Sequence, residues 1–206
     1  ISFFFLSLCL LISYFYWSKN LEMSHLLAAN ADLVFKKKQF WRLITSLFVH
    51  ADLKHLLSNS MMLGFLCYFV ASFYNKLTLS FLFIFGGAIT NALCLLFYPA
   101  HVYLVGASGV IFLLWGFWLV LFMGIETRYG LISRTIRAVG VFLILLVPTS
   151  YSPQTSYLAH YMGFFIGMLG GIMYYFIFKD RILAYEKWSF KFSFDDELDP
   201  KLWEES

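Results

Sequence analysis

Residues 107–124 of the chain read ASGVIFLLWGFWLVLFMG and hold no charged side chain. A helix needs about 20 mostly apolar residues to cross the hydrocarbon core of a bilayer, so this stretch is a candidate transmembrane helix. A backbone surrounded by lipid must satisfy its own hydrogen bonds, and a helix does so within one segment. The stretch therefore predicts a helical membrane protein.

Further apolar runs flank this stretch, and the chain as a whole is 61% hydrophobic and only 13% charged. Soluble domains usually carry about 25% charged residues. Residues 1–178 are expected to form one membrane core, and residues 179–206 a cytoplasmic or interfacial tail. The fold class predicted is an all-α polytopic membrane protein with six transmembrane helices, at about 2–17, 54–74, 77–98, 107–124, 135–149 and 157–178.

The basic residues are spread between the apolar runs, and the net charge is only +3, so no nucleic-acid partner is expected. Arg128, Arg134, Arg137 and the basic tail favour a cytoplasmic N-terminus, although Lys36–Lys38 argue the other way. The first run lacks the basic start and the cleavage site of a signal peptide, so we expect a membrane helix there. The cysteines lie within apolar runs, which argues against a disulfide framework or a thiolate metal site.

The segment at 18–53 differs from the rest because it is long and mixed in composition. It places Lys36–Lys38 beside Phe40, Trp41 and Arg42. Tryptophan and arginine together suit the headgroup layer of a bilayer. We therefore expect a structured first loop that lies against the membrane interface or partly within it.

Polar side chains are costly inside a bilayer and mark functional positions. Here most of them gather at three helix starts, with His55 and Asn59 at the second helix, Ser108 at the fourth and His160 at the sixth. These three helices cross the membrane in the same direction. Their first turns are therefore expected at one face, which the charge distribution makes the outer face.

A serine and a histidine at one depth suggest nucleophilic catalysis. The hydroxyl of Ser108 becomes nucleophilic when a base takes its proton, and His160 can be that base. No Asp or Glu lies in a nearby apolar run, so the pattern predicts a dyad. The first amides of a helix lack partners, so those of Ser108 and Gly109 can face an oxyanion. His55 and Asn59 share a helical face and can donate to the same oxyanion.

The predicted packing brings these two residues together. Ser108 and Phe112 share one face of the fourth helix with Gly116, and Phe112 can pack on the imidazole of His160. A stripe of small residues lets two helix backbones approach closely. The sixth helix carries such a stripe at Gly163, Gly167 and Gly171.

Each feature also has a simpler interpretation. Gly106-Ala107-Ser108-Gly109 alone is typical of a plain turn into a helix, the glycine stripe of ordinary packing, and one membrane histidine of a satisfied polar residue. His50, Asp52 and His55 offer metal-binding atoms, but their spacing is not that of His-Glu-x-x-His. We expect neither a metal nor another cofactor, and we expect His50 to be a loop or interface residue.

In these residues the chain resembles the rhomboid family of intramembrane serine proteases, over nearly its whole length. The resemblance implies a six-helix core with a water-filled cavity that opens to the outer side. The motifs that match are Trp41-Arg42, His50 and His55 with Asn59, Gly106-Ala107-Ser108-Gly109, and Ala159-His160 with Gly163 and Gly167.

The resemblance also implies roles. The first loop would half-insert into the membrane, and the fifth helix with its following loop, about Thr135 to Ser156, would act as the substrate gate. Many bacterial members carry tyrosine where this chain has Phe112, whose ring can still stack on the base. The implied site residues are the nucleophile Ser108, the base His160 and the oxyanion donors His55 and Asn59.

The function implied is that of an intramembrane serine endopeptidase that cleaves transmembrane segments of protein substrates. Its expected setting is a bacterial inner membrane, the family's commonest location for such a minimal core. One alternative is a catalytically silent relative that binds membrane proteins for quality control. A transporter or channel would want paired intramembrane charges or broken helices, which we do not find. Neither the substrate nor the oligomeric state follows from the sequence.

Overall fold

A computed structural model of the chain describes residues 2–18, 26–126, 128–146 and 155–185. Within these ranges the chain is helical, and its only β-type pairing is an isolated bridge between Ala29 and Leu104. The helical segments are α1 (Ser2–Trp17), η1 (Asp32–Lys36), α3 (Arg42–Thr45), α4 (Leu53–Tyr74), α5 (Lys76–Phe81), η2 (Leu82–Gly86), α6 (Gly87–Phe97), α7 (Ser108–Ile125), α8 (Leu131–Leu146) and α9 (Tyr157–Tyr185).

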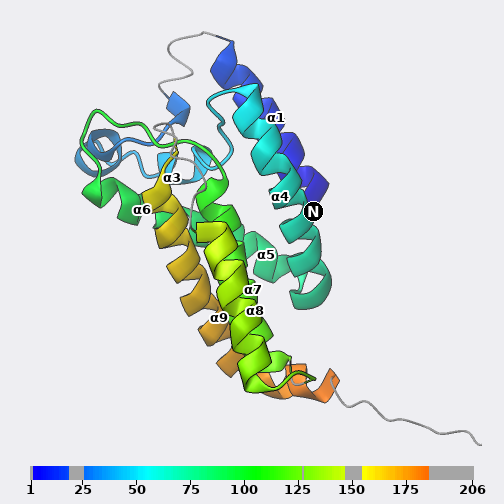
Figure 1. Cartoon of the computed structure of the whole chain (residues 1–206). Coiled ribbons are helices and arrows are strands. Elements are labelled where there is room, and N and C mark those ends of the chain that lie inside the picture. Colours follow the sequence, from blue (N-terminus) through cyan, green and yellow to red (C-terminus); the bar gives the residue numbers. More distant parts are fainter. Residues whose placement is uncertain (1, 19–25, 127, 147–154, 186–206) are drawn as a thin grey trace, which may run out of the picture.

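Every apolar run of the sequence forms helix, which confirms the all-α membrane fold class (Figure 1). The segments α5, η2 and α6 follow one another without a break. Among the residues that the structure describes, three stretches are long and apolar enough to cross a membrane: Lys76–Phe97, Ser108–Ile125 and Tyr157–Ile182. The number of membrane crossings stays a prediction, as does the division into a core and a tail.

Two helix ends differ from expectation. The helix α8 begins at Leu131 rather than near residue 135, and its first turn includes Arg134, whose Nη1 donates to the carbonyl of Met123 at 2.7 Å. Because its charged side chain has this partner near the end of α7, Arg134 can lie within the first turn of α8. The helix α9 continues past residue 178 to Tyr185. The alternating residues at 188–194 lie outside the described part of the chain.

The helices α7 and α9 pack closely along their length, and glycines make this possible. A Cβ atom added to Gly163 would overlap the carbonyl of Gly109, and one added to Gly167 would overlap the carbonyl of Leu113. Larger residues at these two positions of α9 would therefore push the backbones apart. The glycine stripe sets the distance between the two helices that carry Ser108 and His160.

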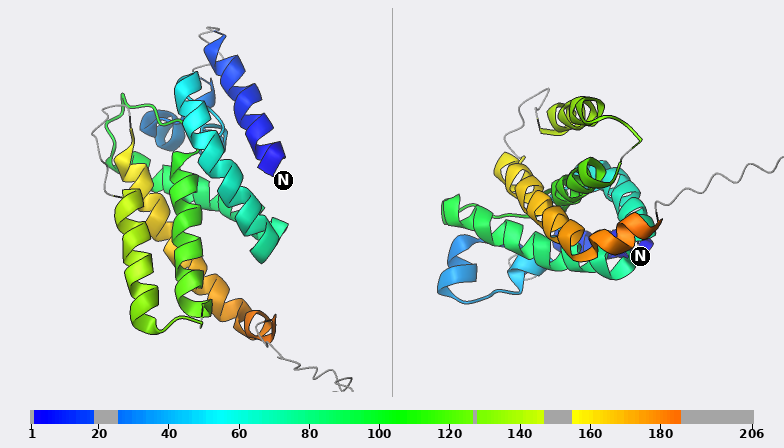
Figure 2. Two further views of the ribbon diagram at one scale, coloured as in Figure 1. Left: turned by 45° about the vertical axis from the view of Figure 1, so that its right-hand side comes forward. Right: turned by 90° about the horizontal axis from the view of Figure 1, so that it is seen from below.

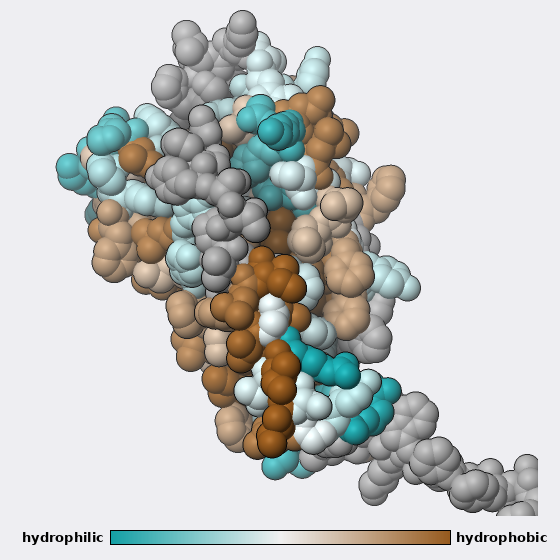
Figure 3. All heavy atoms as spheres, in the orientation of Figure 1, coloured by the Kyte–Doolittle hydropathy of each residue, from teal (hydrophilic) through white to brown (hydrophobic). Residues whose placement is uncertain are grey.

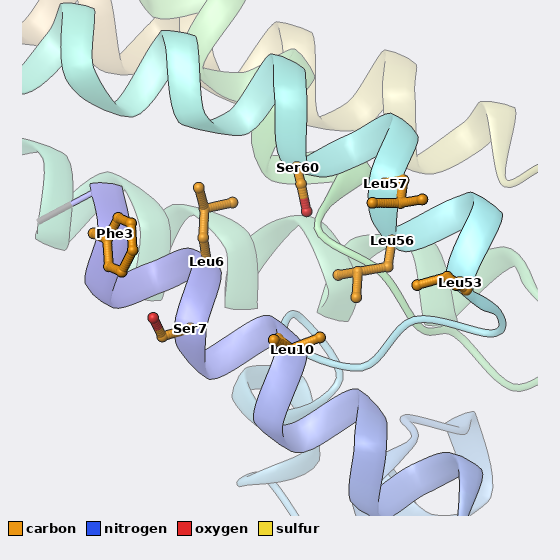
Figure 4. A pocket seen from close by; sticks show the side chains of 8 residues that line it. All are labelled: Phe3, Leu6, Ser7, Leu10, Leu53, Leu56, Leu57 and Ser60. Atoms are coloured by element: carbon orange, nitrogen blue, oxygen red, sulfur yellow. The ribbon is translucent and has the colours of Figure 1, made fainter.

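The helix α1 lies against α4 on the other side of the molecule (Figure 2). The ring of Phe5 in α1 stacks on Phe83 of η2 at 4.1 Å, which joins α1 to the main core. Between α1 and α4 lies a groove of about 260 Å³, shown in Figure 4. Its lining, which includes neither Ser108 nor His160, consists of Phe3, Leu6, Ser7, Leu10, Leu53, Leu56, Leu57 and Ser60.

The helix α8 is the most exposed part of the bundle. It packs on α7 and touches α9 where Phe142 meets Phe164, with ring centroids 5.4 Å apart. Ile132, Ile136 and Ile144 are 67–81% exposed. Hydrophobic side chains run down this face to the lower end of the bundle, and hydrophilic ones lie beside them there (Figure 3). A contiguous apolar face of this kind suits lipid as its surroundings.

The described part of the first loop is structured, and Arg42 is buried within it. Its Nη1 donates to the carbonyl of Ala28 at 2.9 Å, and its Nε donates to Gln39 Oε1 at 2.6 Å. A guanidinium has five donors and can satisfy several buried acceptors of a loop at once. Trp41, its neighbour, is half exposed as expected of an interface residue.

Candidate active site

The helices α4, α7 and α9 begin at the same end of the bundle (Figure 1). His55 lies in the first turn of α4, Ser108 is the first residue of α7, and His160 lies in the first turn of α9. Ser108 and His160 are both partly exposed. The fold therefore brings the predicted residues to one depth from three separate parts of the chain.

The turn before Ser108 depends on glycine. Gly106 has φ +114°, a conformation that residues with a Cβ rarely adopt. Its N–H donates to the carbonyl of Ser46 at 2.9 Å, and Ala107 behind it is fully buried. The first intrahelical bond of α7 is donated by Ile111, so the amides of Ser108 and Gly109 have no partner within the helix. These two amides can therefore serve as oxyanion donors.

His55 and Asn59 lie against this turn. A Cβ atom added to Gly106 would lie 3.0 Å from Cε1 of His55 and 3.9 Å from Nδ2 of Asn59. Asn59 is buried, and its Nδ2 has no hydrogen-bond partner. An unsatisfied buried donor costs about 1–3 kcal/mol, so this amide has free energy to gain from an acceptor placed beside Gly106.

The imidazole of His160 is held by stacking. Its ring lies parallel to that of Phe112, with centroids 4.1 Å apart and an interplanar angle of 16°. The residues beside the two reactive groups also touch, because a Cβ atom added to Gly109 would lie 3.5 Å from the carbonyl of Ala159. Gly109 follows Ser108 and Ala159 precedes His160, so the two first turns lie against each other.

In the described part of the chain, no hydrogen bond joins Ser108 to His160. Catalytic hydrogen bonds are often long or poorly aligned without substrate and tighten once it binds. The arrangement places the two side chains on first turns that lie against each other. The geometry fits a nucleophile and base that engage in the substrate complex.

The acidic residue nearest to the site in sequence has a structural task. Asp52 is the N-cap of α4, and its Oδ1 accepts a hydrogen bond from the backbone N–H of His55 at 2.8 Å. Asp52 thereby fixes the first turn of α4, which presents His55. Among the described residues, no group of three or more His, Cys, Asp or Glu side chains could hold a metal ion.

His50 lies in the loop between α3 and α4, as one of the two predicted settings has it, and it is buried there. It is 1% exposed, its backbone N–H donates to Ser13 Oγ at 3.0 Å, and its carbonyl accepts from Trp17 Nε1 at 2.8 Å. Burial, with a smaller contribution from His55, lowers the pKa of His50 to about 4. Its ring lies 5.3 Å from that of His55. His50 thus joins α1 to the segment that leads into the site.

A second support was missed by the sequence reasoning. Asn91 in α6 donates from Nδ2 to the carbonyl of Leu43 at 3.1 Å and to Ser46 Oγ at 3.0 Å. The carbonyl of Ser46 in turn accepts from Gly106. Asn91 therefore fixes the loop that holds the turn before Ser108. The available signal was an asparagine in the middle of an apolar run, which is costly unless satisfied.

Comparisons with known proteins identify relatives of the chain. A family model of the rhomboid domain matches residues 37–176. Rhomboid-type serine protease 2 of Eremothecium gossypii is 34% identical over 141 residues, which cover 66% of this chain and 54% of that protein. RHOMBOID-like protein 1 of Arabidopsis thaliana is 26% identical over 155 residues, which cover 75% of this chain and 40% of that protein.

The chain thus spans about half the length of the curated relatives that it matches. Both relatives are eukaryotic, so they lend no support to a location in a bacterial inner membrane. The matched region contains the turns that carry His55, Ser108 and His160.

Proposed function

Because the chain belongs to the rhomboid family, we propose that it is an intramembrane serine endopeptidase with Ser108 as nucleophile and His160 as base. The observation that carries the proposal is the contact between the first turns of α7 and α9, where Gly109 lies against Ala159. The stacking of Phe112 on His160 supports it, because the ring needs an orienting partner when no carboxylate is present.

The proposed reaction begins when His160 takes the proton of Ser108 Oγ, which attacks the carbonyl carbon of a peptide bond. The tetrahedral intermediate carries a negative charge on the former carbonyl oxygen. It collapses when the carbon–nitrogen bond breaks and His160 gives its proton to the leaving amine. Water, deprotonated by His160, then attacks the acyl-enzyme, and its proton returns to Ser108 Oγ as the carboxylic acid leaves.

The oxyanion would be stabilised by donors that converge on the turn at Gly106. The amides of Ser108 and Gly109 lie at the start of α7, where the helix dipole also favours negative charge. Asn59 Nδ2 is buried without a partner, and His55 lies against the same turn. Donors that are in place before the reaction lose little free energy in reorganising, which makes them effective.

We propose a transmembrane segment of another protein as the substrate. The helix α8 is then the candidate gate, because it covers α7 and part of α9 and presents an exposed apolar face to the lipid. We further propose that the site opens on the outer side of the membrane. The basic residues Arg128, Arg134 and Arg137 lie around the opposite end of α7 and α8, which the positive-inside rule assigns to the cytoplasm.

The alternative is a catalytically silent member that binds membrane proteins. The absence of a Ser108–His160 hydrogen bond in the described residues is the observation in its favour. A fluorophosphonate probe, which reacts with activated serines, separates the two functions. Labelling at Ser108 of the purified protein would favour the protease, and a lack of labelling in any lipid would favour the binding protein.

The decisive test is cleavage of a reporter transmembrane substrate in liposomes by the wild type, Ser108→Ala and His160→Ala. We expect cleavage by the wild type and a loss of at least about 10³-fold in both variants, because removal of either member of a dyad disables the whole unit. Circular dichroism would check that both variants stay folded. Cleavage by Ser108→Ala at the wild-type rate would show that another residue is the nucleophile.

A further inference from the structure

A hydrogen bond joins two parts of the chain that the proposed mechanism leaves unexplained. The hydroxyl of Tyr98 lies 2.7 Å from Ser156 Oγ, although the two residues are 58 positions apart in sequence. Tyr98 directly follows α6 as its C-cap, and Ser156 directly precedes α9. The bond therefore connects the end of one helix to the start of the helix that carries His160.

Ser156 is bonded to the first turn of α9 in two ways. Its Oγ accepts a hydrogen bond from the N–H of Ala159 at 3.2 Å, as the side chain of an N-cap residue does. Its carbonyl accepts from the N–H of His160 at 3.2 Å. The position of Ser156 therefore determines where the first turn of α9 begins. It also determines the height of His160, by which we mean its position along the axis of α9.

Tyr98, the other member of the hydrogen bond, is fixed by contacts with its own helix and with a buried cluster. Its N–H donates to the carbonyl of Cys94, and its ring packs on a buried cluster that includes Leu95, Leu104 and Ala159. Tyr98 also begins the segment that leads to Gly106 and Ser108. It thus sits at a fixed point relative to the nucleophile.

The helices α7 and α9 need a contact that fixes their positions along each other. Glycines let α7 and α9 approach closely, but Gly163 and Gly167 have no side chains that would resist sliding of one helix along the other. A directional hydrogen bond at the first turn of α9 would fix the height of His160.

We propose that Tyr98 and Ser156 are positioning residues that set the height of His160 relative to Ser108. This inference rests on the proposed function, since it assigns the pair a task in the same site. Neither residue touches the reacting atoms. A misplacement of about 1 Å between a base and its nucleophile can cost about 10²-fold in rate. A smaller shift of His160 relative to Ser108 should therefore lower kcat measurably.

The test compares Tyr98→Phe, Ser156→Ala, the double variant and Ser156→Thr, with Tyr68→Phe as the matched control. Tyr68→Phe also removes one hydroxyl, from an exposed position on α4 away from the pair. Cleavage of the reporter transmembrane substrate gives kcat and KM, and thermal unfolding gives the stability of each variant. Ser108→Ala is included to test the proposed function separately.

We expect Tyr98→Phe and Ser156→Ala each to lower kcat about tenfold while KM changes less than about twofold. The double variant should be no slower than the slower single variant, because both remove the same bond. Ser156→Thr keeps the hydroxyl and should retain most of the activity. If Ser156→Ala does not fold, Tyr98→Phe alone, which only deletes an oxygen, still decides the matter.

An unchanged kcat in Tyr98→Phe, an effect confined to KM, or losses that multiply in the double variant would each overturn the inference. If Ser108→Ala is inactive while Tyr98→Phe equals the wild type, the positioning role fails and the proposed function stands. If Ser108→Ala still cleaves, or if the wild type neither cleaves nor reacts with the fluorophosphonate probe, the proposed function fails and the positioning role falls with it.

Discussion

The helices α9 and α8 follow one another in the chain but are held in opposite ways. Gly163 and Gly167 of α9 contact the backbone of α7 so closely that no Cβ atom would fit. Gly140 of α8 has open space where a Cβ would be placed. The start of α9 is tied down by hydrogen bonds through Ser156, whereas α8 turns Ile136 and Ile144 away from the bundle.

This difference shows how one bundle can hold two helices at a fixed separation and still leave a third helix easy to displace. A proposed dyad needs its two helices at a fixed separation, and backbone contact between glycines provides it. A substrate that arrives from the lipid needs a helix that can be displaced at low cost, and such elements have few buried contacts. The predictions below separate these two requirements.

The largest effect is expected where the packing of α9 is broken. Gly163→Ala would place a methyl group on the carbonyl of Gly109, so α9 must move away from α7. We expect cleavage to fall by more than about 10²-fold and the free energy of unfolding to drop by about 1–3 kcal/mol. Cleavage assays and denaturation in detergent measure both. Wild-type activity in this variant would mean that the close approach of the helices is not needed.

A second prediction removes a proposed oxyanion donor and leaves the packing of α7 and α9 unchanged. Asn59→Ala deletes the buried Nδ2 that has no partner in the structure. We expect kcat to fall by about 10²–10³-fold, because an oxyanion donor is lost, while stability stays the same or rises slightly. A parallel loss of stability and activity would instead indicate that Asn59 is a structural residue.

A third prediction concerns the support of the site on the side of α1. Burial is the main reason that the pKa of His50 is lowered to about 4, and the unfolded chain has the ordinary value near 6.5. The unfolded state therefore binds more protons between these values, and stability should fall as the pH falls from about 6.5 to 4, by up to about 1.4 kcal/mol per pH unit. Unfolding followed at pH 5 and pH 7.5 measures this.

The matched variant for this measurement is His50→Gln, which has no titrating group. It should be less stable at neutral pH, and the part of the pH dependence that belongs to His50 should disappear. An identical pH dependence in the wild type and the variant would assign it to another group, such as His55, whose ring lies 5.3 Å from that of His50.

The smallest effect is expected in α8 and serves as the control for α9. Gly140→Ala adds a methyl group in open space, so no contact is disturbed. Alanine is a better helix former than glycine, which should leave activity within about twofold of wild type and stability equal or higher by less than about 1 kcal/mol. A strong loss of activity in this variant would show that α8 packs more tightly in the functional state than it does here.

The sequence alone was sufficient to predict the helical membrane fold. It also predicted that the polar residues meet at one end of the bundle. Both follow from local properties. The length and apolar character of each run predict a helix, and the alternating direction of successive helices places His55, Ser108 and His160 at one face. The boundaries were less certain, since the ends of α8 and α9 depend on side chains such as Arg134 that find partners elsewhere.

Only the tertiary structure decided which polar side chains face water, lipid or the interior. Arg42 beside Trp41 suggested the headgroup layer, yet loop carbonyls distant in sequence satisfy it inside the protein. His50 is buried because Ser13 and Trp17 of α1 fold over it. A hydrogen bond such as that of Tyr98 to Ser156 depends on two helix ends meeting in space, and no local pattern of residue types contains that distance.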